Sequence, residues 1–320
     1  MAHEMDATDA MRSELPGIGP RRSATALGRQ LLNKVPEVTI YFWIIKILCT
    51  TVGETAADFL NSHLNLGLTG TTYVMSSLLL IALFFQFKLR RYVPSVYWIA
   101  VVLISVVGTL ITDNLTDNFG VSLVTTTIVF SAALAATFAA WYVSEKTLSI
   151  HTIYTIRREG FYWLTVLFTF ALGTAAGDLV AERFNLGYWV SGLMFAALIA
   201  IVAITHSRFG VNAILAFWIG YILTRPLGAS LGDYLSQARA DGGIGLGSVG
   251  TSALFLLAIL SLVIYLTVTR KDASESGTEG ERLQGLGTTF VPADGSDHHV
   301  IHPQHRLPHG LPHTAIDEAL

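Results

Sequence analysis

The chain has 320 residues, of which 52% are hydrophobic and only 13% are charged, and its mean hydropathy is +0.54. The charged share is about half of that in an ordinary soluble domain, and a net charge of −3 without a basic patch argues against nucleic-acid binding. The apolar runs are too long for a soluble core, so the sequence predicts an all-α protein that crosses a membrane several times.

Eight runs reach or approach the roughly 20 residues that a helix needs to cross the hydrocarbon core. In chain order they cover 38–60, 67–87, 95–114, 120–143, 161–181, 187–205, 210–233 and 249–269. The acidic, polar segment before the first run has no apolar centre, so we expect the first run to act as an uncleaved insertion signal. The single cysteine, Cys49, excludes a disulfide framework and a cysteine-based metal cluster.

The segments between the runs differ in charge from one side to the other. One side carries most of the basic residues: Arg21, Arg22, Arg29, Lys34, Lys88, Arg90, Arg91, Lys146, Arg157, Arg158, Arg208, Arg270 and Lys271. The other side has few, Arg183 and Arg239. The positive-inside rule therefore predicts cytoplasmic N- and C-termini, and we expect a multi-pass protein of the bacterial inner membrane.

The odd-numbered runs share one template, W-x9-G-x4-D, with an aromatic residue before each tryptophan. Its four copies are Trp43, Gly53 and Asp58; Trp98, Gly108 and Asp113; Trp163, Gly173 and Asp178; and Trp218, Gly228 and Asp233. The repeating unit is thus a two-helix hairpin used four times, and the membrane domain divides into halves at 37–150 and 151–271. Because each unit contains two spans, all four units enter the membrane in the same direction.

Each position of the template predicts a physical role. The tryptophans are expected as interface anchors at the cytoplasmic end, where indoles prefer the headgroup region. The glycines are expected to let helices pack closely. The aspartates then fall in the outer half of the membrane. The even-numbered spans have charges only at their ends, so we expect the odd helices inside, facing each other, and the even helices outside, facing lipid.

The segments YFWIIKILCTTVGETAADFL, VYWIAVVLISVVGTLITDNL, FYWLTVLFTFALGTAAGDLV and FWIGYILTRPLGASLGDYL resemble the repeats of a bacterial membrane-protein family, Domain of Unknown Function 347. The resemblance covers about residues 36–270 and implies eight helices in four tandem pairs, without an established activity. The acidic-Gly-Asp motif in paired repeats is also similar to that of calcium and manganese exporters, although the spacing differs.

Two charged residues, Glu54 and Arg225, break the four-fold pattern. Glu54 stands where the other repeats have Thr109, Thr174 and Ala229, and it shares a helix face with Asp58. Arg225 is expected to pair with a carboxylate, either as a structural ion pair or as a counter-ion or gating group. Lys46 stands near the cytoplasmic end of its span, so we expect it to snorkel to the interface, with a counter-ion or gating role as the alternative.

The two tails differ in composition from the membrane domain. Residues 1–36 and 272–320 are expected to be disordered cytoplasmic tails. The C-terminal tail carries six of the ten histidines: His298, His299, His302, His305, His309 and His313. Imidazoles at this density can bind Zn²⁺, Ni²⁺ or Cu²⁺ weakly, but a solvated tail without function is the interpretation that the composition favours.

Carboxylates within a membrane are costly, and they are typical of ion and proton pathways. We therefore expect a secondary transporter of small cations, with a divalent metal such as Mn²⁺ as the first candidate and the proton as the second. The expected cation-pathway and metal-ligand residues are Glu54, Asp58, Asp113, Asp178 and Asp233. The expected partners are the lipid bilayer and the cation itself; no resident cofactor is expected.

The alternative is a non-transporting scaffold or sensor in which the aspartates only connect helices. An enzyme is not expected, because the spans hold no nucleophile–base pair. The sequence also lacks a phosphate-binding loop, a dinucleotide fingerprint and an HExxH motif.

Overall fold

The computed structural model describes residues 33–63, 66–183 and 186–272. These residues form eight helices that are long and apolar enough to cross a membrane. They are α2 (Ile40–His63), α3 (Gly67–Lys88), α4 (Pro94–Asp113), α5 (Leu123–Glu145), α6 (Ile156–Asp178), α7 (Gly187–Phe209), α8 (Ala213–Ser236) and α9 (Gly247–Thr269). The eight predicted spans are confirmed, and the largest difference is that α6 begins five residues before the predicted 161.

Local signals account for several helix ends. Ser122 and Thr155 each accept a hydrogen bond from a backbone N–H in the first turn of α5 and α6, and Asn212 does the same for α8. The Thr155 cap explains the early start of α6. The α7 helix ends at Gly210, whose φ of +67° is a conformation that glycine adopts without a steric cost.

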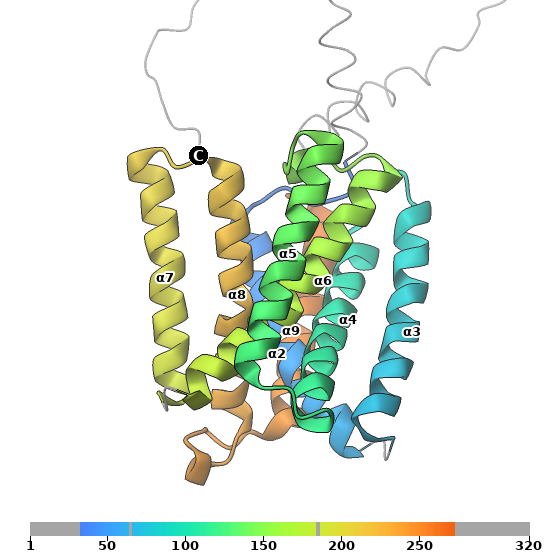
Figure 1. The fold of residues 1–320 in the computed structure, drawn as a ribbon. Helices are drawn as coiled ribbons and strands as arrows, with labels where there is room; N and C mark the ends of the chain where they lie inside the picture. Colours follow the sequence, from blue (N-terminus) through green and yellow to red (C-terminus); the bar gives the residue numbers. More distant parts are fainter. Residues whose placement is uncertain (1–32, 64–65, 184–185, 273–320) are drawn as a thin grey trace, which may run out of the picture.

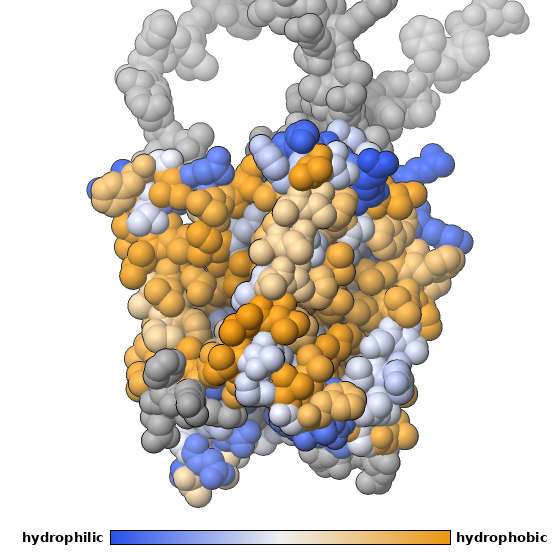
Figure 2. Space-filling view, viewed as in Figure 1, coloured by the Kyte–Doolittle hydropathy of each residue, from blue (hydrophilic) through white to orange (hydrophobic). Residues whose placement is uncertain are grey.

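The bundle has an inner ring and an outer layer (Figure 1). In the most apolar window of each inner helix (α2, α4, α6 and α8) 50–67% of residues are buried, against 11–28% in α3, α5, α7 and α9. The predicted separation into odd helices inside and even helices outside is therefore confirmed. The outer helices present leucine, isoleucine, valine and phenylalanine to the surroundings, and the flank of the molecule is apolar between two polar ends (Figure 2).

Each outer helix packs mainly on the inner helix of the following repeat. The α3 helix lies against α4 more extensively than against α2, α5 lies against α6, and α7 lies against α8. The last outer helix, α9, packs against α2 and so closes the circle between the last repeat and the first. The Thr55 and Ser252 hydroxyls, 2.7 Å apart, join α2 and α9 at this closure.

The template glycines hold the inner ring together. A Cβ on Gly53 would overlap Ser105 of α4, and one on Gly108 would meet Phe170 of α6. A Cβ on Gly173 would overlap Arg225 of α8, and one on Gly228 would overlap Thr50 of α2. The four residues met, Thr50, Ser105, Phe170 and Arg225, are themselves equivalent positions of the repeat. The same contact thus recurs around a closed ring, as approximate four-fold symmetry requires, and the predicted packing role of the glycines is confirmed.

The first and last described residues lie at the same end of the bundle, called here the terminal end, and pack on it (Figure 1). Lys34 donates its backbone N–H to the Ile153 carbonyl oxygen at 3.0 Å, and its Nζ lies 2.6 Å from Glu159 Oε2. Asp272 is 2% exposed and accepts a hydrogen bond from the Tyr92 hydroxyl at 2.6 Å. Predicting disorder for 33–36 and 272 was wrong, because these residues are anchored to the bundle. The predictions for 1–32 and 273–320, with the tail histidines, lie outside the described residues.

Candidate cation pathway

Positions four residues apart on the inner helices define successive layers of the ring, because residues i and i+4 are neighbours on a helix surface. From the terminal end, the first four layers are an aromatic layer (Phe42, Tyr97, Tyr162, Phe217), a lysine layer (Lys46, Val101, Val166, Tyr221), an arginine layer (Thr50, Ser105, Phe170, Arg225) and a glutamate layer (Glu54, Thr109, Thr174, Ala229). The aspartate layer (Asp58, Asp113, Asp178, Asp233) is the last. In the lysine, arginine and glutamate layers every residue is at most 7% exposed.

The Arg225 guanidinium lies at the centre of the glutamate layer. Its Nη2 lies within hydrogen-bond distance of Glu54 Oε2 at 2.7 Å, of Thr174 Oγ1 at 2.7 Å, and of Thr109 Oγ1, and its two N–H groups are shared among these three acceptors. The Arg225 side chain is fully buried and that of Glu54 is 10% exposed. One arginine from α8 therefore contacts the equivalent position of each of the other three repeats. The prediction that Arg225 pairs with a carboxylate is confirmed, but the partner is Glu54 and not an aspartate.

This arrangement has a steric cause. The α8 helix itself carries Ala229 in the glutamate layer, so it leaves room on the axis at that level. Arg225 lies one turn earlier, and its long side chain extends into this room, with its Cβ and Cγ against the backbone of Gly173. The sequence analysis did not identify Thr109 and Thr174 as binding residues, although they occupy the repeat positions equivalent to Glu54. The missing signal was the direction of the arginine side chain.

The four aspartates lie at the opposite end from the termini and are all half-buried. Asp113 interacts electrostatically with Asp58 and Asp178, and Asp233 interacts with the same two. Every neighbouring pair around the ring is thus within electrostatic range. Asp113 and Asp178 are each followed directly by a π-helical turn, Asn114–Asn118 and Leu179–Arg183. Such turns occur frequently at functional sites in helical proteins.

The predicted metal-ligand set does not come together as a coordination site. Within the part of the chain that the structure describes, no three His, Cys, Asp or Glu side chains lie close enough to hold a metal ion. Glu54 is engaged by Arg225, one layer away from the aspartates. The structure therefore contains a ring of carboxylates with a separate ion pair behind it.

Lys46 lies inside the bundle and not at its surface. It is 1% exposed, and its Nζ lies 4.2 Å from the centres of both the Phe170 and Tyr221 rings. Its Nζ also donates to Thr224 Oγ1 at 3.3 Å. The snorkelling interpretation is therefore wrong, because the side chain extends towards the axis of the ring and not along the lipid-facing surface.

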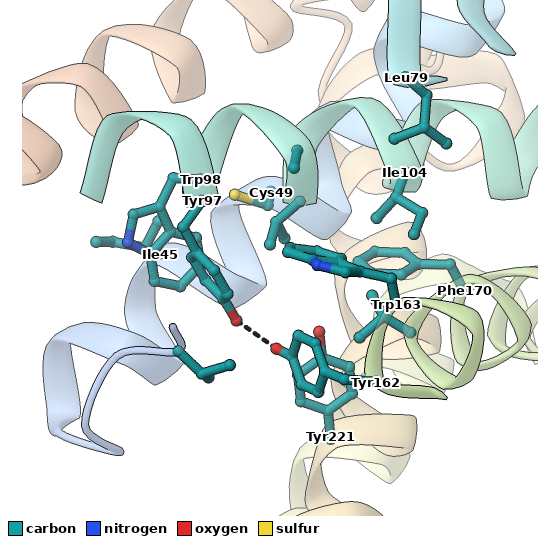
Figure 3. Close-up of a cluster of buried hydrophobic side chains, with 14 of the residues drawn as sticks. Ile45, Cys49, Leu79, Tyr97, Trp98, Ile104, Tyr162, Trp163, Phe170 and Tyr221 are labelled. Atoms are coloured by element: carbon teal, nitrogen blue, oxygen red, sulfur yellow. Dashed lines mark hydrogen bonds between the residues drawn. The ribbon is translucent and has the colours of Figure 1, made fainter. Parts of the chain in front are cut away.

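Buried aromatic residues pack together inside the inner ring (Figure 3). The Tyr97 and Tyr162 hydroxyls are hydrogen-bonded to each other, and the Tyr221 ring lies next to Tyr162. Trp98, Trp163 and Trp218 are 1%, 3% and 4% exposed. The prediction that these three are interface anchors is wrong, because neighbouring helices and not lipid headgroups surround their indoles. The fourth, Trp43, is half-buried and packs on Phe217, with 5.7 Å between ring centres.

Comparison with known proteins identifies the repeat but supplies no activity. No curated protein and no solved structure matches the sequence. One family of repeats matches the chain four times in tandem, over residues 41–92, 96–147, 161–211 and 216–272. Each match covers one inner helix and the outer helix that follows it. Together the matches span most of the membrane domain, so the chain belongs to the family described as Repeat of Unknown Function (DUF347).

Proposed function

We propose that this protein is a secondary transporter of small cations whose pathway follows the axis of the inner ring. The observation that carries the proposal is the charge arrangement along this axis. Four equivalent carboxylates stand at one end, and a buried Glu54–Arg225 ion pair lies one layer further in. A buried charge costs several kcal/mol unless it is paired, so charged residues retained at this depth are typical of ion pathways.

The Arg225 side chain can adopt two arrangements, one paired with Glu54 and one without it. A cation that leaves the aspartate layer for Glu54 competes with the Arg225 guanidinium for the same carboxylate. When the cation binds, Arg225 loses its partner and turns to the Thr109 and Thr174 hydroxyls, which it already contacts. The residues of the aromatic layer close the axis towards the terminal end. An ion gradient drives the exchange, since the sequence contains no phosphate-binding loop.

Carboxylate oxygens suit a divalent cation such as Mn²⁺, and they also suit a proton. The excess of lysine and arginine at the terminal end supports an orientation with both termini in the cytoplasm, in the bacterial inner membrane. The lipid bilayer is then the partner of the apolar outer helices.

The test combines cells and vesicles. Cells with and without the gene are compared for accumulation of and sensitivity to Mn, Zn, Ni, Co and Mg, and the purified protein is tested for uptake of the affected ion into vesicles. Asp58→Asn should abolish uptake at normal expression, because it removes one carboxylate of the ring. Asp241→Asn makes the same change at an exposed loop position of the same end and should leave uptake intact.

Two results count against the proposal. Full activity of Asp58→Asn would remove the aspartate layer from the pathway. If neither metal nor proton movement depends on the protein, the non-transporting scaffold or sensor is favoured. In that case the charged layers only connect the helices.

A further inference from the structure

We infer that Lys46 is the proton-binding group that couples cation transport to proton exchange. The inference rests on the proposed function, and it adds the coupling ion and the residue that carries it. Lys46 lies in the layer where the other three repeats have Val101, Val166 and Tyr221. The lysine is therefore a specific departure from the repeat pattern at a buried axial position.

The surroundings of Lys46 offer contacts to both of its protonation states. Among the described residues, no carboxylate lies within ion-pair distance of its Nζ, so the ammonium lacks the partner that a buried charge normally requires. The Phe170 and Tyr221 rings offset part of this cost by cation–π contact with the ammonium. The Thr224 hydroxyl donates to the Tyr221 carbonyl oxygen and accepts from Lys46, and either the ammonium or the neutral amine can supply that hydrogen bond.

The titratable and charged groups that interact with Lys46 are Cys49 on α2 and Tyr221 and Arg225 on α8. Tyr162 on α6 lies beside Tyr221, and Tyr97 on α4 is hydrogen-bonded to Tyr162. On α9, Tyr265 lies against Tyr41 at the terminal end. Arg225 interacts with Lys46 electrostatically and pairs with Glu54 in the pathway. A cation on Glu54 and a proton on Lys46 add positive charge to one buried segment, so the binding of either disfavours the other.

Tyrosine side chains lie between Lys46 and the terminal end. Tyr221 lies next to Tyr162, whose hydroxyl is bonded to that of Tyr97 (Figure 3). The buried Tyr221 hydroxyl itself has no hydrogen-bond partner among the described residues. In the arginine layer, the buried Arg225 Nε and Ser105 Oγ have no protein partner, and such groups are normally satisfied by internal water. In the coupling step, one N–H bond of the ammonium breaks, the electron pair stays on Nζ, and the proton passes to water, which carries it to the solution at the terminal end. Rebinding of a proton reverses the step.

Two substitutions separate proton binding from simple packing. Lys46→Met removes the charge at similar length. Lys46→Arg keeps the charge and the cation–π contacts but does not release a proton. Lys88→Met is the matched control, because Lys88 also lies over an aromatic ring, that of Phe84 at 4.5 Å, but is exposed. Each full-length protein is reconstituted into vesicles with an internal pH dye, and Mn²⁺ is added outside.

The wild type and Lys88→Met should move protons when Mn²⁺ enters. Lys46→Met and Lys46→Arg should move at least about tenfold fewer protons per Mn²⁺, since a positioned proton carrier is lost. Wild-type coupling in Lys46→Arg would overturn the inference and assign Lys46 a cation–π packing role.

A second measurement does not depend on transport. Proton binding by the folded, metal-free proteins is titrated between about pH 6 and 9, a window in which an exposed lysine stays protonated. Lys46→Met and Lys46→Arg should each exchange about one proton fewer than Lys88→Met. Equal proton counts would overturn the inference. If the protein with Lys46 intact binds one proton more than the Lys46 variants but the wild type moves no Mn²⁺, Lys46 is supported as the proton site and the metal is rejected as the substrate.

Discussion

Glu54 and Arg225 are 171 residues apart in the chain, and their side chains form an ion pair with 2.7 Å between Oε2 and Nη2. The pair joins the inner helices of the first and last repeats, which are neighbours in the closed ring. It uses one position in each of these repeats that departs from the repeat pattern, so the two departures compensate each other in charge.

Removing one member of this pair should be costly. Arg225→Met leaves the Glu54 carboxylate without its partner, and Glu54→Gln leaves the guanidinium without a carboxylate. Each should destabilise the protein by about 3–5 kcal/mol, because the remaining charge is buried. The double variant should recover much of this loss. Thermal unfolding in detergent of both single variants and the double variant measures the coupling, and additive losses would contradict it.

Gly173→Leu should destabilise the inner ring. A Cβ at this position already overlaps Arg225, and Pro226 Cδ lies 3.2 Å away, so a larger side chain forces α6 and α8 apart. We expect a loss of about 1–3 kcal/mol or more from overpacking. Gly250→Leu on the outer helix α9 is the control, because nothing lies within 4 Å of its Cβ position. Equal unfolding temperatures in detergent for the two variants would remove the packing role.

The Lys34–Glu159 pair should stabilise the terminal end far more than a surface pair does. Its side chains are 6% and 1% exposed, and Gln86 also donates to the Glu159 carboxylate at 3.2 Å. Lys34→Met should therefore cost about 3–5 kcal/mol. Arg157→Met removes a 71% exposed partner of Glu145 at 3.9 Å and should cost about 0–1 kcal/mol. Thermal unfolding of both variants decides the point, and similar losses would show that Lys34 contributes no more than a surface charge.

Asp272 should make stability depend on pH. Burial raises the pKa of this carboxyl, and the hydrogen bond from Tyr92 offsets the rise only in part. A raised pKa means that the folded protein favours the protonated acid, so stability falls as pH rises through that pKa. Asp272→Asn keeps an oxygen that accepts from Tyr92 but carries no charge. Its advantage over the wild type should grow from pH 4 to pH 8, as measured by unfolding temperature; a constant difference would contradict the expected linkage.

The sequence alone determined the eight spans, the four-fold repeat and the place of the aspartates. These features depend on local quantities: the length of apolar runs, the period of the template, and the parallel direction that two spans per unit impose. The inner and outer layers also followed from the sequence, because charges lie only in the odd spans. The close contacts at Gly53, Gly108, Gly173 and Gly228 were expected for the same reason, since small residues permit helices to approach.

The tertiary structure decided which helices touch and where the long polar side chains point. An apolar helix face has the same hydropathy whether lipid or another helix covers it, so the sequence did not reveal that α3 packs on α4, or that α9 closes the ring on α2. For the same reason, the sequence did not reveal that Trp98 and Trp163 are buried between helices. Lys46 and Arg225 have flexible stems that reach either the interface or the axis. The space beside Ala229 and the rings of Phe170 and Tyr221 direct them to the axis, and those neighbours come together only in the closed ring.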